Sequence, residues 1–173
     1  MTGPADVTIR SGLQGELAAL AAVADDAALT LSEAGFPQFG QSCVTLPSLA
    51  ACHAEGLLWT AVDGADHPLG FVAATIADDN LHIVAIAVAR ANQRRGIGRI
   101  LMRRAIDHGR WAFFPAVTLT ADAVAPFGAP FYRRLGFVAL APKRLPSDLT
   151  AHLRCECTLF GSRAERIAMA KVL

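Results

Sequence analysis

An apolar run that passes through a short polar loop into a helix constrains this 173-residue chain more than any other feature. Leu81 to Val88 is almost continuously apolar, which is typical of a central strand covered on both faces. The loop Gln93-Arg94-Arg95-Gly96-Ile97-Gly98 follows, and apolar residues at helical spacing then predict a helix from Gly98 to Phe113. The sequence therefore predicts a strand–loop–helix unit.

The start of this helix is predicted to bind an anion. A helix N-terminus leaves several main-chain amides without acceptors, and the helix dipole adds partial positive charge there. Gly96 and Gly98 let the backbone approach an anion closely, and Arg94, Arg95 or Arg99 could add charge-assisted hydrogen bonds to phosphate. The loop has neither the G-x-x-x-x-G-K-[ST] nor the G-x-G-x-x-G pattern, so it is neither a Walker A loop nor a Rossmann loop.

The rest of the chain is predicted to form short helices and strands. Before the apolar run, we predict strands at 7–10, 57–62 and 70–76, helices at 13–24, 26–33 and 47–54, and a loop at 36–45. After it, we predict strands at 116–121, 137–140 and 166–172 and helices at 126–135 and 148–160. A parallel crossover would span the 98–113 helix. The fold class is therefore α/β of the α+β type: a mixed, mostly antiparallel central sheet with helices on both faces, in a single domain over residues 1–173.

Composition and charge exclude several classes of function. The formal net charge of +1 provides no electrostatic footprint for nucleic acid or for an anionic membrane. No apolar run approaches the ~20 residues that a membrane-spanning helix needs. Residues 1–10 lack the basic start and apolar run of a secretory signal, so we expect a cytoplasmic protein with free thiols. Cys155 and Cys157 have no second cysteine pair at metal-binding spacing, so we predict no metal site.

Two correctly spaced motifs resemble the GNAT superfamily of acyl-CoA-dependent N-acyltransferases. The loop from Gln93 to Gly98 is similar to the family's Q/R-x-x-G-x-G/A motif. Phe131-Tyr132-Arg133-Arg134-Leu135-Gly136-Phe137 is similar to its Y-x-x-x-G-F signature, at the expected distance downstream. Pro126-Phe127-Gly128-Ala129-Pro130 resembles a subgroup of small bacterial members. The resemblance is strongest over residues 57–137.

The resemblance implies acetyl-CoA as co-substrate, without a metal, and a splayed parallel strand pair whose gap the pantetheine arm would fill. Main-chain groups of the strand before the loop would run beside the arm, with the Val88 amide directed at the thioester oxygen. Amides from Arg94 onward would hold the pyrophosphate. The cofactor-binding residues predicted in this way are Ile86, Ala87, Val88, Gln93, Arg94, Arg95, Gly96, Ile97, Gly98 and Arg99.

The resemblance also implies roles for two side chains. Tyr132 matches the family tyrosine near the sulfur, where a phenol with an ordinary pKa of about 10 can protonate the leaving thiolate. His82 matches a position where some members carry a glutamate or histidine base, which would take the proton of the attacking amine. A packing role is the alternative for both side chains. Asp79, Asp122 and main-chain groups acting through water are alternatives for the base.

The acceptor is predicted to be a primary amine of an unidentified small molecule, which would attack acetyl-CoA directly in a ternary complex. Phe36 and Phe127 are candidates to line its pocket, although phenylalanine is more often a core residue. Many members of the family carry an asparagine where this chain has Ala125, Pro126 and Gly128, so one expected contact is missing. The family often forms dimers, and the strand from Arg166 could pair between chains in a homodimer.

Two other functions are compatible with parts of this sequence. A non-catalytic acyl-CoA-binding regulatory module would use the same loop without a working base or acceptor pocket. A nucleotide-binding protein is supported by the glycine-rich loop alone, and the missing Walker and Rossmann patterns argue against it.

Overall fold

The structure is a computed structural model that describes residues 7–33, 35–36, 42–160 and 165–173. The chain forms two compact units. Unit 1 comprises Met1–Thr75 and Val84–Asp107, and unit 2 comprises Ile76–Ile83 and His108–Leu173. A single domain over the whole chain stays a prediction.

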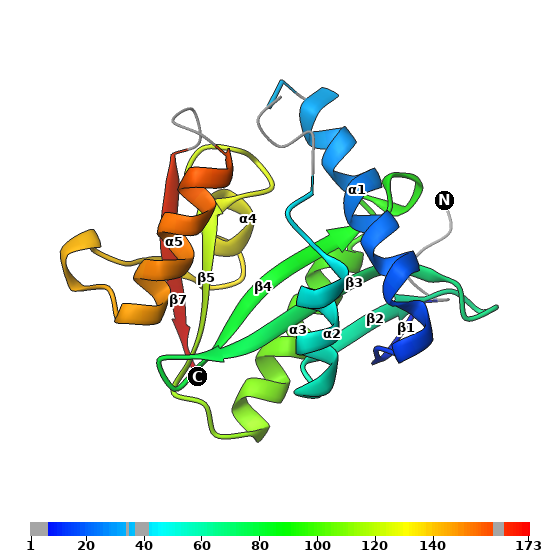
Figure 1. Ribbon diagram of the computed structural model, residues 1–173, viewed down its shortest axis with the longest axis horizontal. Coiled ribbons are helices and arrows are strands. Elements are labelled where there is room, and N and C mark those ends of the chain that lie inside the picture. The colour runs from blue at the N-terminus through cyan, green and yellow to red at the C-terminus, as the bar shows by residue number, and fades with distance from the viewer. Residues whose placement is uncertain (1–6, 34, 37–41, 161–164) are drawn as a thin grey trace. The chain divides into compact units, whose positions relative to one another are not determined.

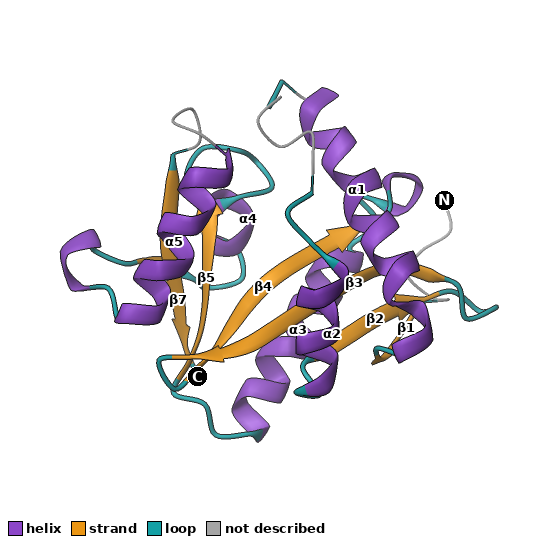
Figure 2. Ribbon diagram, viewed as in Figure 1, coloured by secondary structure: helices purple, strands orange, loops and turns teal. Residues whose placement is uncertain are grey.

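The strands form the mixed sheet that the sequence predicts (Figures 1 and 2), and their order along it is β1-β2-β3-β4-β5-β7-β6. The pairs β1–β2, β2–β3, β5–β7 and β6–β7 are antiparallel, whereas β4 and β5 are parallel, with Leu81, His82 and Ile83 opposite Val117, Thr118 and Leu119. The strands are β1 (Thr8–Ser11), β2 (Leu58–Val62), β3 (Pro68–Ala77), β4 (Asn80–Val88), β5 (Ala116–Asp122), β6 (Val138–Ala139) and β7 (Arg166–Val172).

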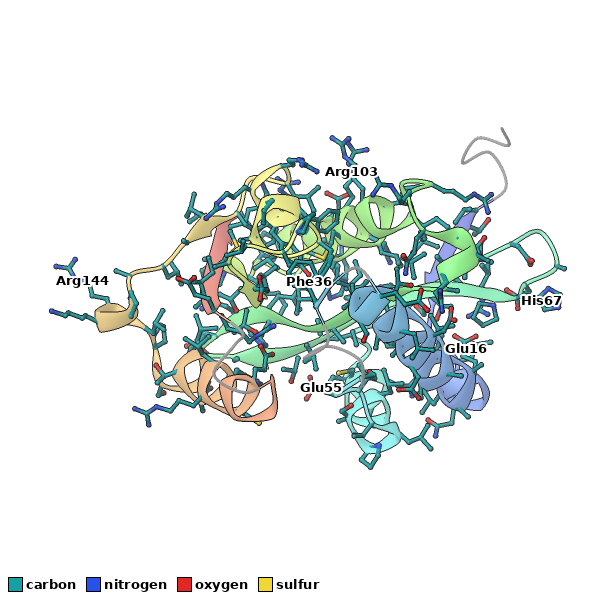
Figure 3. All side chains as sticks on the ribbon, turned by 90° about the horizontal axis from the view of Figure 1, so that it is seen from above. Glu16, Phe36, Glu55, His67, Arg103 and Arg144 are labelled. Atoms are coloured by element: carbon teal, nitrogen blue, oxygen red, sulfur yellow. The ribbon has the colours of Figure 1, made fainter. Side chains whose placement is uncertain are left out.

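In unit 1, α1 (Leu17–Glu33) and α2 (Leu46–Ala54) cover one face of the strands, and α3 (Ile97–Trp111) lies on the other (Figures 1 and 3). Leu20 and Leu49 of the first two helices pack against Phe71 of β3 in one buried cluster. The prediction of separate helices at 13–24 and 26–33 is wrong. No glycine or proline interrupts Leu17–Glu33, so a single helix forms.

Strands β3 and β4 approach closely at Gly70. A Cβ atom at this position would lie 2.7 Å from the Ala87 carbonyl oxygen and 3.1 Å from Val88 Cα, both main-chain atoms. We therefore expect Gly70→Ala to push β4 away and to lower the free energy of unfolding by about 1–3 kcal/mol. Urea denaturation measures this loss. Gly64→Ala is the matched control, because a Cβ atom there meets nothing within 4 Å; equal losses in the two variants would contradict the explanation.

In unit 2, α4 (Ala129–Arg133) and α5 (Ser147–Phe160) lie on opposite faces of β5 and β7 (Figure 3). Strand β7 pairs with β5 on one side and β6 on the other, so it already has two partners within the chain. Its bounds match the prediction, whereas α4 is shorter than the predicted 126–135 because the chain from Asp122 to Gly128 forms a tight turn.

A turn between β3 and β4 caps the N-terminus of α5. The Asp78 carboxylate accepts hydrogen bonds from the Asp148 amide at 3.1 Å and the Leu149 amide at 2.9 Å. The Asp78 amide in turn donates to the Asp148 carboxylate at 3.1 Å. Asp78 and Asp79 both have positive φ, of 48° and 61°, so the turn occupies the left-handed region. Residues from separate segments therefore satisfy the exposed amides of α5.

The remaining predictions concern boundaries and the outer surface. Helix α2 follows its prediction and ends at Ala54, and Gly56, whose φ is 71°, lies just past this end. Part of the loop predicted at 36–45 and the helix stop at Gly161 lie outside the described residues. Within the described part of the chain, the helices are all too short or too polar to cross a membrane.

Candidate functional site

The chain leaves β4 through a short loop that is closed by its own hydrogen bonds. We call residues 89–93 the anchor loop; it includes a 3-10 turn over Arg90–Asn92. The Ala89 amide donates to the Leu69 carbonyl of β3 at 2.9 Å. The side-chain amide of Gln93 donates to the Val88 carbonyl at 3.0 Å, so it bridges the end of β4 and the end of the loop.

The residues after this loop present a series of main-chain amides at the start of α3. We call Arg94 to Arg99 the cradle. Across the described residues, no protein acceptor is found for any cradle amide, and the first helical bond runs from the Ile100 amide to the Gly96 carbonyl at 3.1 Å. Arg94 and Gly96 have φ of 59° and 83°, and left-handed residues in such a turn allow successive amides to form an anion-binding concavity. Such a surface binds anions.

The charged side chains of the cradle lie at the surface. Arg94, Arg95 and Arg99 are exposed, and Arg95 Nη1 donates to Asn92 Oδ1 at 2.7 Å. Gly96 has open space where a Cβ atom would be, so its role is conformational. Arg103, farther along α3, points outward into solvent (Figure 3). The cradle therefore combines main-chain amides with positive charge, as the sequence predicts for an anion site.

The strand residues before the loop form a largely apolar lead into the cradle. Ile86 and Val88 are half-buried, and Ala87 lies between them with 9% of its surface exposed. The contact of β4 with Gly70 of β3 fixes this end of the strand. All the predicted cofactor-binding residues thus lie on one continuous segment within unit 1, from Ile86 through Arg99.

Sequence reasoning missed the helix residues that hold the anchor loop. The Asp26 carboxylate of α1 accepts a hydrogen bond from the Arg90 amide at 2.7 Å. Glu33 pairs with the Arg90 guanidinium, and Thr30 makes a longer 3.5 Å contact with the Gln93 side chain. These helix residues lie on one face at spacings of four and three residues, but their partners Arg90 and Gln93 are distant in sequence, so the sequence alone does not indicate the contacts.

The motif around Tyr132 forms a compact corner in unit 2. Tyr132 lies on α4 and is 8% exposed; its ring packs edge-on against Phe131 and Phe137, with centroids 5.1 Å and 5.9 Å away. Gly136, at a φ of 87°, ends the helix, and the Phe137 amide returns to the Tyr132 carbonyl at 3.1 Å. The glycine and phenylalanine of the motif therefore fix the position of the tyrosine.

The Tyr132 hydroxyl is suited to donate a proton. Burial of the ring raises the pKa of Tyr132 to about 12, so the phenol stays protonated at neutral pH. The hydroxyl makes no hydrogen bond to any residue that the structure describes, although a buried phenol normally has a partner. Its hydrogen-bonding capacity is therefore left for a bound molecule or water.

His82 has the properties of a core histidine. It is completely buried on β4, its Nδ1 atom lies 3.0 Å from the Thr118 hydroxyl, and its ring stacks on His152 with centroids 4.2 Å apart. Burial first, and His152 second, lower the pKa of His82 to about 3. Nε2 is enclosed and has no partner among the described residues. A ring with this pKa is a poor proton acceptor near neutral pH, so these properties favour the packing alternative.

The other predicted side chains are distributed over both units. Asp122 is buried, and its carboxylate accepts from the amides of Val124 at 2.9 Å and Ala125 at 2.7 Å, so it stabilises the turn after β5. Asp79 is exposed in the turn after β3. Phe36 and Phe127 are half-buried, in unit 1 and unit 2 respectively.

An ion pair that the sequence did not predict lies near Tyr132. Glu156 of α5 pairs with Arg166 of β7, and both contact the Thr120 hydroxyl of β5. Only 10% of the Arg166 side chain and 20% of the Glu156 side chain are exposed. Arg166 lowers and Glu156 raises the pKa of the Tyr132 phenol, effects smaller than that of burial. Within the described residues, no three His, Cys, Asp or Glu side chains are grouped as metal ligands.

Comparison with protein families gives a match over most of the chain. Residues 25–137 match the model of the acetyltransferase (GNAT) family. The match includes the anchor loop, the cradle and the whole motif from Phe131 to Phe137.

Solved structures share the fold at low sequence identity. An N-acetylglutamate synthase from Neisseria gonorrhoeae, complexed with coenzyme A and N-acetyl-glutamate, superimposes with a TM-score of 0.71 at 17% identity over 96% of this chain. This chain spans only 35% of that enzyme. The ribosomal-protein-S18-alanine N-acetyltransferase from Escherichia coli gives 0.69 at 19% identity, covering 96% of this chain and 93% of that one. PaiA N-acetyltransferase from Thermoplasma acidophilum, in complex with coenzyme A, gives 0.70 at 13%, covering 96% and 99%.

Proposed function

The chain belongs to the acetyltransferase (GNAT) family, and from this membership we propose that it transfers an acetyl group from acetyl-CoA to a primary amine of a small molecule. The observation that carries the proposal is the cradle, whose main-chain amides find no protein acceptor among the described residues at the N-terminus of α3. The diphosphate of coenzyme A supplies the anionic oxygens that such amides bind.

The strand before the cradle is suited to bind the pantetheine arm of the cofactor. Ile86, Ala87 and Val88 lead directly into the anchor loop, so a molecule whose diphosphate binds the cradle can extend its pantetheine arm along them. The positive charge of Arg94, Arg95 and Arg99 complements the negative charge of the nucleotide end. Acetyl-CoA therefore fits this segment better than a neutral ligand.

The proposed reaction is a direct attack in a ternary complex. The nitrogen lone pair of the neutral amine forms a bond to the thioester carbonyl carbon, and the C–S bond then breaks. The Tyr132 hydroxyl gives its proton to the leaving thiolate, which becomes coenzyme A, and solvent reprotonates the phenolate. Tyr132 can fill this role because its phenol is protonated at neutral pH and makes no hydrogen bond to a described residue.

The amine must also lose a proton, because a primary amine with a pKa near 10 is protonated at neutral pH. We assign this step to water held by main-chain groups rather than to His82, Asp79 or Asp122. The pKa of His82 is lowered to about 3, and Asp122 already accepts from two amides. A homodimer and a pocket lined by Phe36 and Phe127 stay predictions.

Binding and turnover separate this function from its alternatives. Purified protein is titrated with acetyl-CoA by calorimetry, and a panel of amines is then screened for release of the coenzyme A thiol. We expect binding that nucleotides without pantetheine do not match, and thiol release with at least one amine. Acetyl-CoA binding without turnover on any amine would favour the regulatory module. Equal binding of coenzyme A and simple nucleotides would favour a nucleotide-binding protein.

A variant of the cradle tests whether acetyl-CoA binds at this position. Gly96→Asp places a carboxylate beside the cradle amides at a residue whose φ is 83°, so like-charge repulsion and strain should both weaken acetyl-CoA binding. Gly64→Asp introduces the same charge in a turn of unit 1, away from the cradle sequence. Equal affinities in the two variants would place the cofactor elsewhere.

A further inference from the structure

A carboxylate on α1 holds the point at which the chain leaves β4. The Arg90 amide donates to Asp26 Oδ2 at 2.7 Å, and Asp26 is half-buried. A hydrogen bond to a charged acceptor is about twice as strong as a neutral one. Arg90 is the first residue of the 3-10 turn in the anchor loop. The bond therefore joins this loop to a residue of α1 that is 64 positions earlier in the sequence. The side chain of Asp26 thus fixes main-chain atoms directly.

Hydrogen bonds between residues close in sequence connect Arg90 to the cradle. The Gln93 amide donates to the Arg90 carbonyl at 3.3 Å, and the Gln93 side chain donates to the Val88 carbonyl at 3.0 Å. Arg95 Nη1 then reaches Asn92 Oδ1 at 2.7 Å. Each contact spans three to five residues, so a shift at Arg90 displaces the residues whose amides would bind the diphosphate.

Charge alone predicts the opposite effect for this aspartate. A carboxylate near a diphosphate repels it, so electrostatics predicts that removing the charge strengthens binding of coenzyme A. Positioning predicts that removing the carboxylate weakens binding, because the cradle amides are no longer held in place. The sign of the change in affinity therefore separates the two explanations.

We propose that Asp26 is a positioning residue for the cofactor site, acting through the Arg90 amide without touching the cofactor. The inference rests on the proposed function, because it takes the cradle as the diphosphate site. It makes the affinity for coenzyme A depend on a side chain of α1 and on its hydrogen-bond capacity rather than its charge.

The test measures coenzyme A binding by calorimetry, which requires no acceptor. We expect Asp26→Ala to raise the Kd about tenfold, the effect of losing one charge-assisted hydrogen bond. Asp26→Asn keeps an acceptor oxygen and should stay within about threefold of the wild type. Asp25→Ala is the matched control, because Asp25 is the exposed neighbour on the same helix and makes no hydrogen bond that the structure describes.

A second pair of variants tests the same bond from its donor side. Arg90→Pro deletes the N–H donor, and proline is tolerated at the first position of a helical turn that follows an extended residue, as Ala89 is at φ −51° and ψ 140°. Arg90→Ala keeps the donor and removes only the side chain, whose pairing with Glu33 is exposed. We expect proline to weaken binding and alanine to have little effect. Combining Asp26→Ala with Arg90→Pro should add little to either change.

The outcomes distinguish this inference from the proposed function. If the wild-type protein does not bind coenzyme A, both are overturned. If the wild type binds it and Asp26→Ala behaves as Asp25→Ala does, only the positioning role is overturned. Melting temperatures and hydrogen exchange of residues 89–99 complete the test: a tenfold loss of affinity with faster exchange in this segment supports the role. A loss that Asp26→Asn shares in full overturns it.

Discussion

Replacing Tyr132 by phenylalanine is expected to lower the turnover number by about 100-fold and to leave the Kd of acetyl-CoA within about threefold. The change removes the atom that donates a proton to the leaving thiolate in the proposed reaction. The ring keeps its edge contacts with Phe131 and Phe137, so the corner of unit 2 should remain folded. Initial rates of thiol release, with any amine that the screen identifies, measure the effect.

The melting temperature and the affinity for coenzyme A serve as controls for this variant. The hydroxyl makes no hydrogen bond to a described residue, so its removal should lower stability only slightly. A fall in turnover with both controls unchanged assigns the proton to Tyr132. Wild-type turnover in Tyr132→Phe would leave the tyrosine with a packing role alone.

The stability of the protein is expected to fall as the pH drops from 7 to 5, with His82 as a principal cause. The folded state lowers the pKa of His82 from 6.5 to about 3, so below pH 6.5 the unfolded chain takes up a proton that the folded protein does not. The stabilisation is therefore complete above pH 6.5 and is lost as the pH falls toward 3. At about 1.4 kcal/mol for each pKa unit, the loss at pH 5 is about 2 kcal/mol.

Urea denaturation at pH 7, 6 and 5 measures this dependence. His82→Asn should flatten the slope, because asparagine does not titrate, even though the variant is less stable at every pH. His67→Asn, which removes a 75% exposed imidazole beside Asp63, should change the slope less than His82→Asn does. His152 and Asp78 face His82 and also affect its pKa. His152→Asn is therefore measured as well, to separate the contribution of His152 from that of burial. An unchanged slope in His82→Asn would contradict the assignment.

The fold could be predicted from the sequence where short-range chemistry determines it. Strand β7 begins and ends at the predicted residues, and α3 begins within one residue of its prediction, after a run of glycine and arginine. The break predicted within α1 does not occur, because the residues around Asp25 and Asp26 lower helix propensity only weakly and packing against β3 outweighs them. Helix α4 is shorter than predicted because Gly128 lies against the Asp122 carbonyl, a contact between residues on either side of a turn.

The arrangement of the candidate site residues was predictable to the extent that main-chain geometry determines it. The glycines and arginines of the cradle predicted an anion site, which stays a prediction, and the cradle amides have no acceptor among the described residues. The environment of His82 was not predictable, because its burial depends on His152 of α5 and Thr118 of β5. The role of Asp26 was hidden for the same reason, since its partner Arg90 is distant in sequence. Side-chain environments made by distant segments need the tertiary structure.

The cap that Asp78 provides for α5 has a consequence for how the chain folds during synthesis. The β3–β4 turn leaves the ribosome well before Ser147, so at that stage Asp78 has no α5 amides to bind. At that stage the Asp78 carboxylate is bonded to water, and the final geometry is reached only when the C-terminal segment emerges. A nascent chain arrested before Ser147 should therefore show a loosely held hairpin tip, which later synthesis tightens.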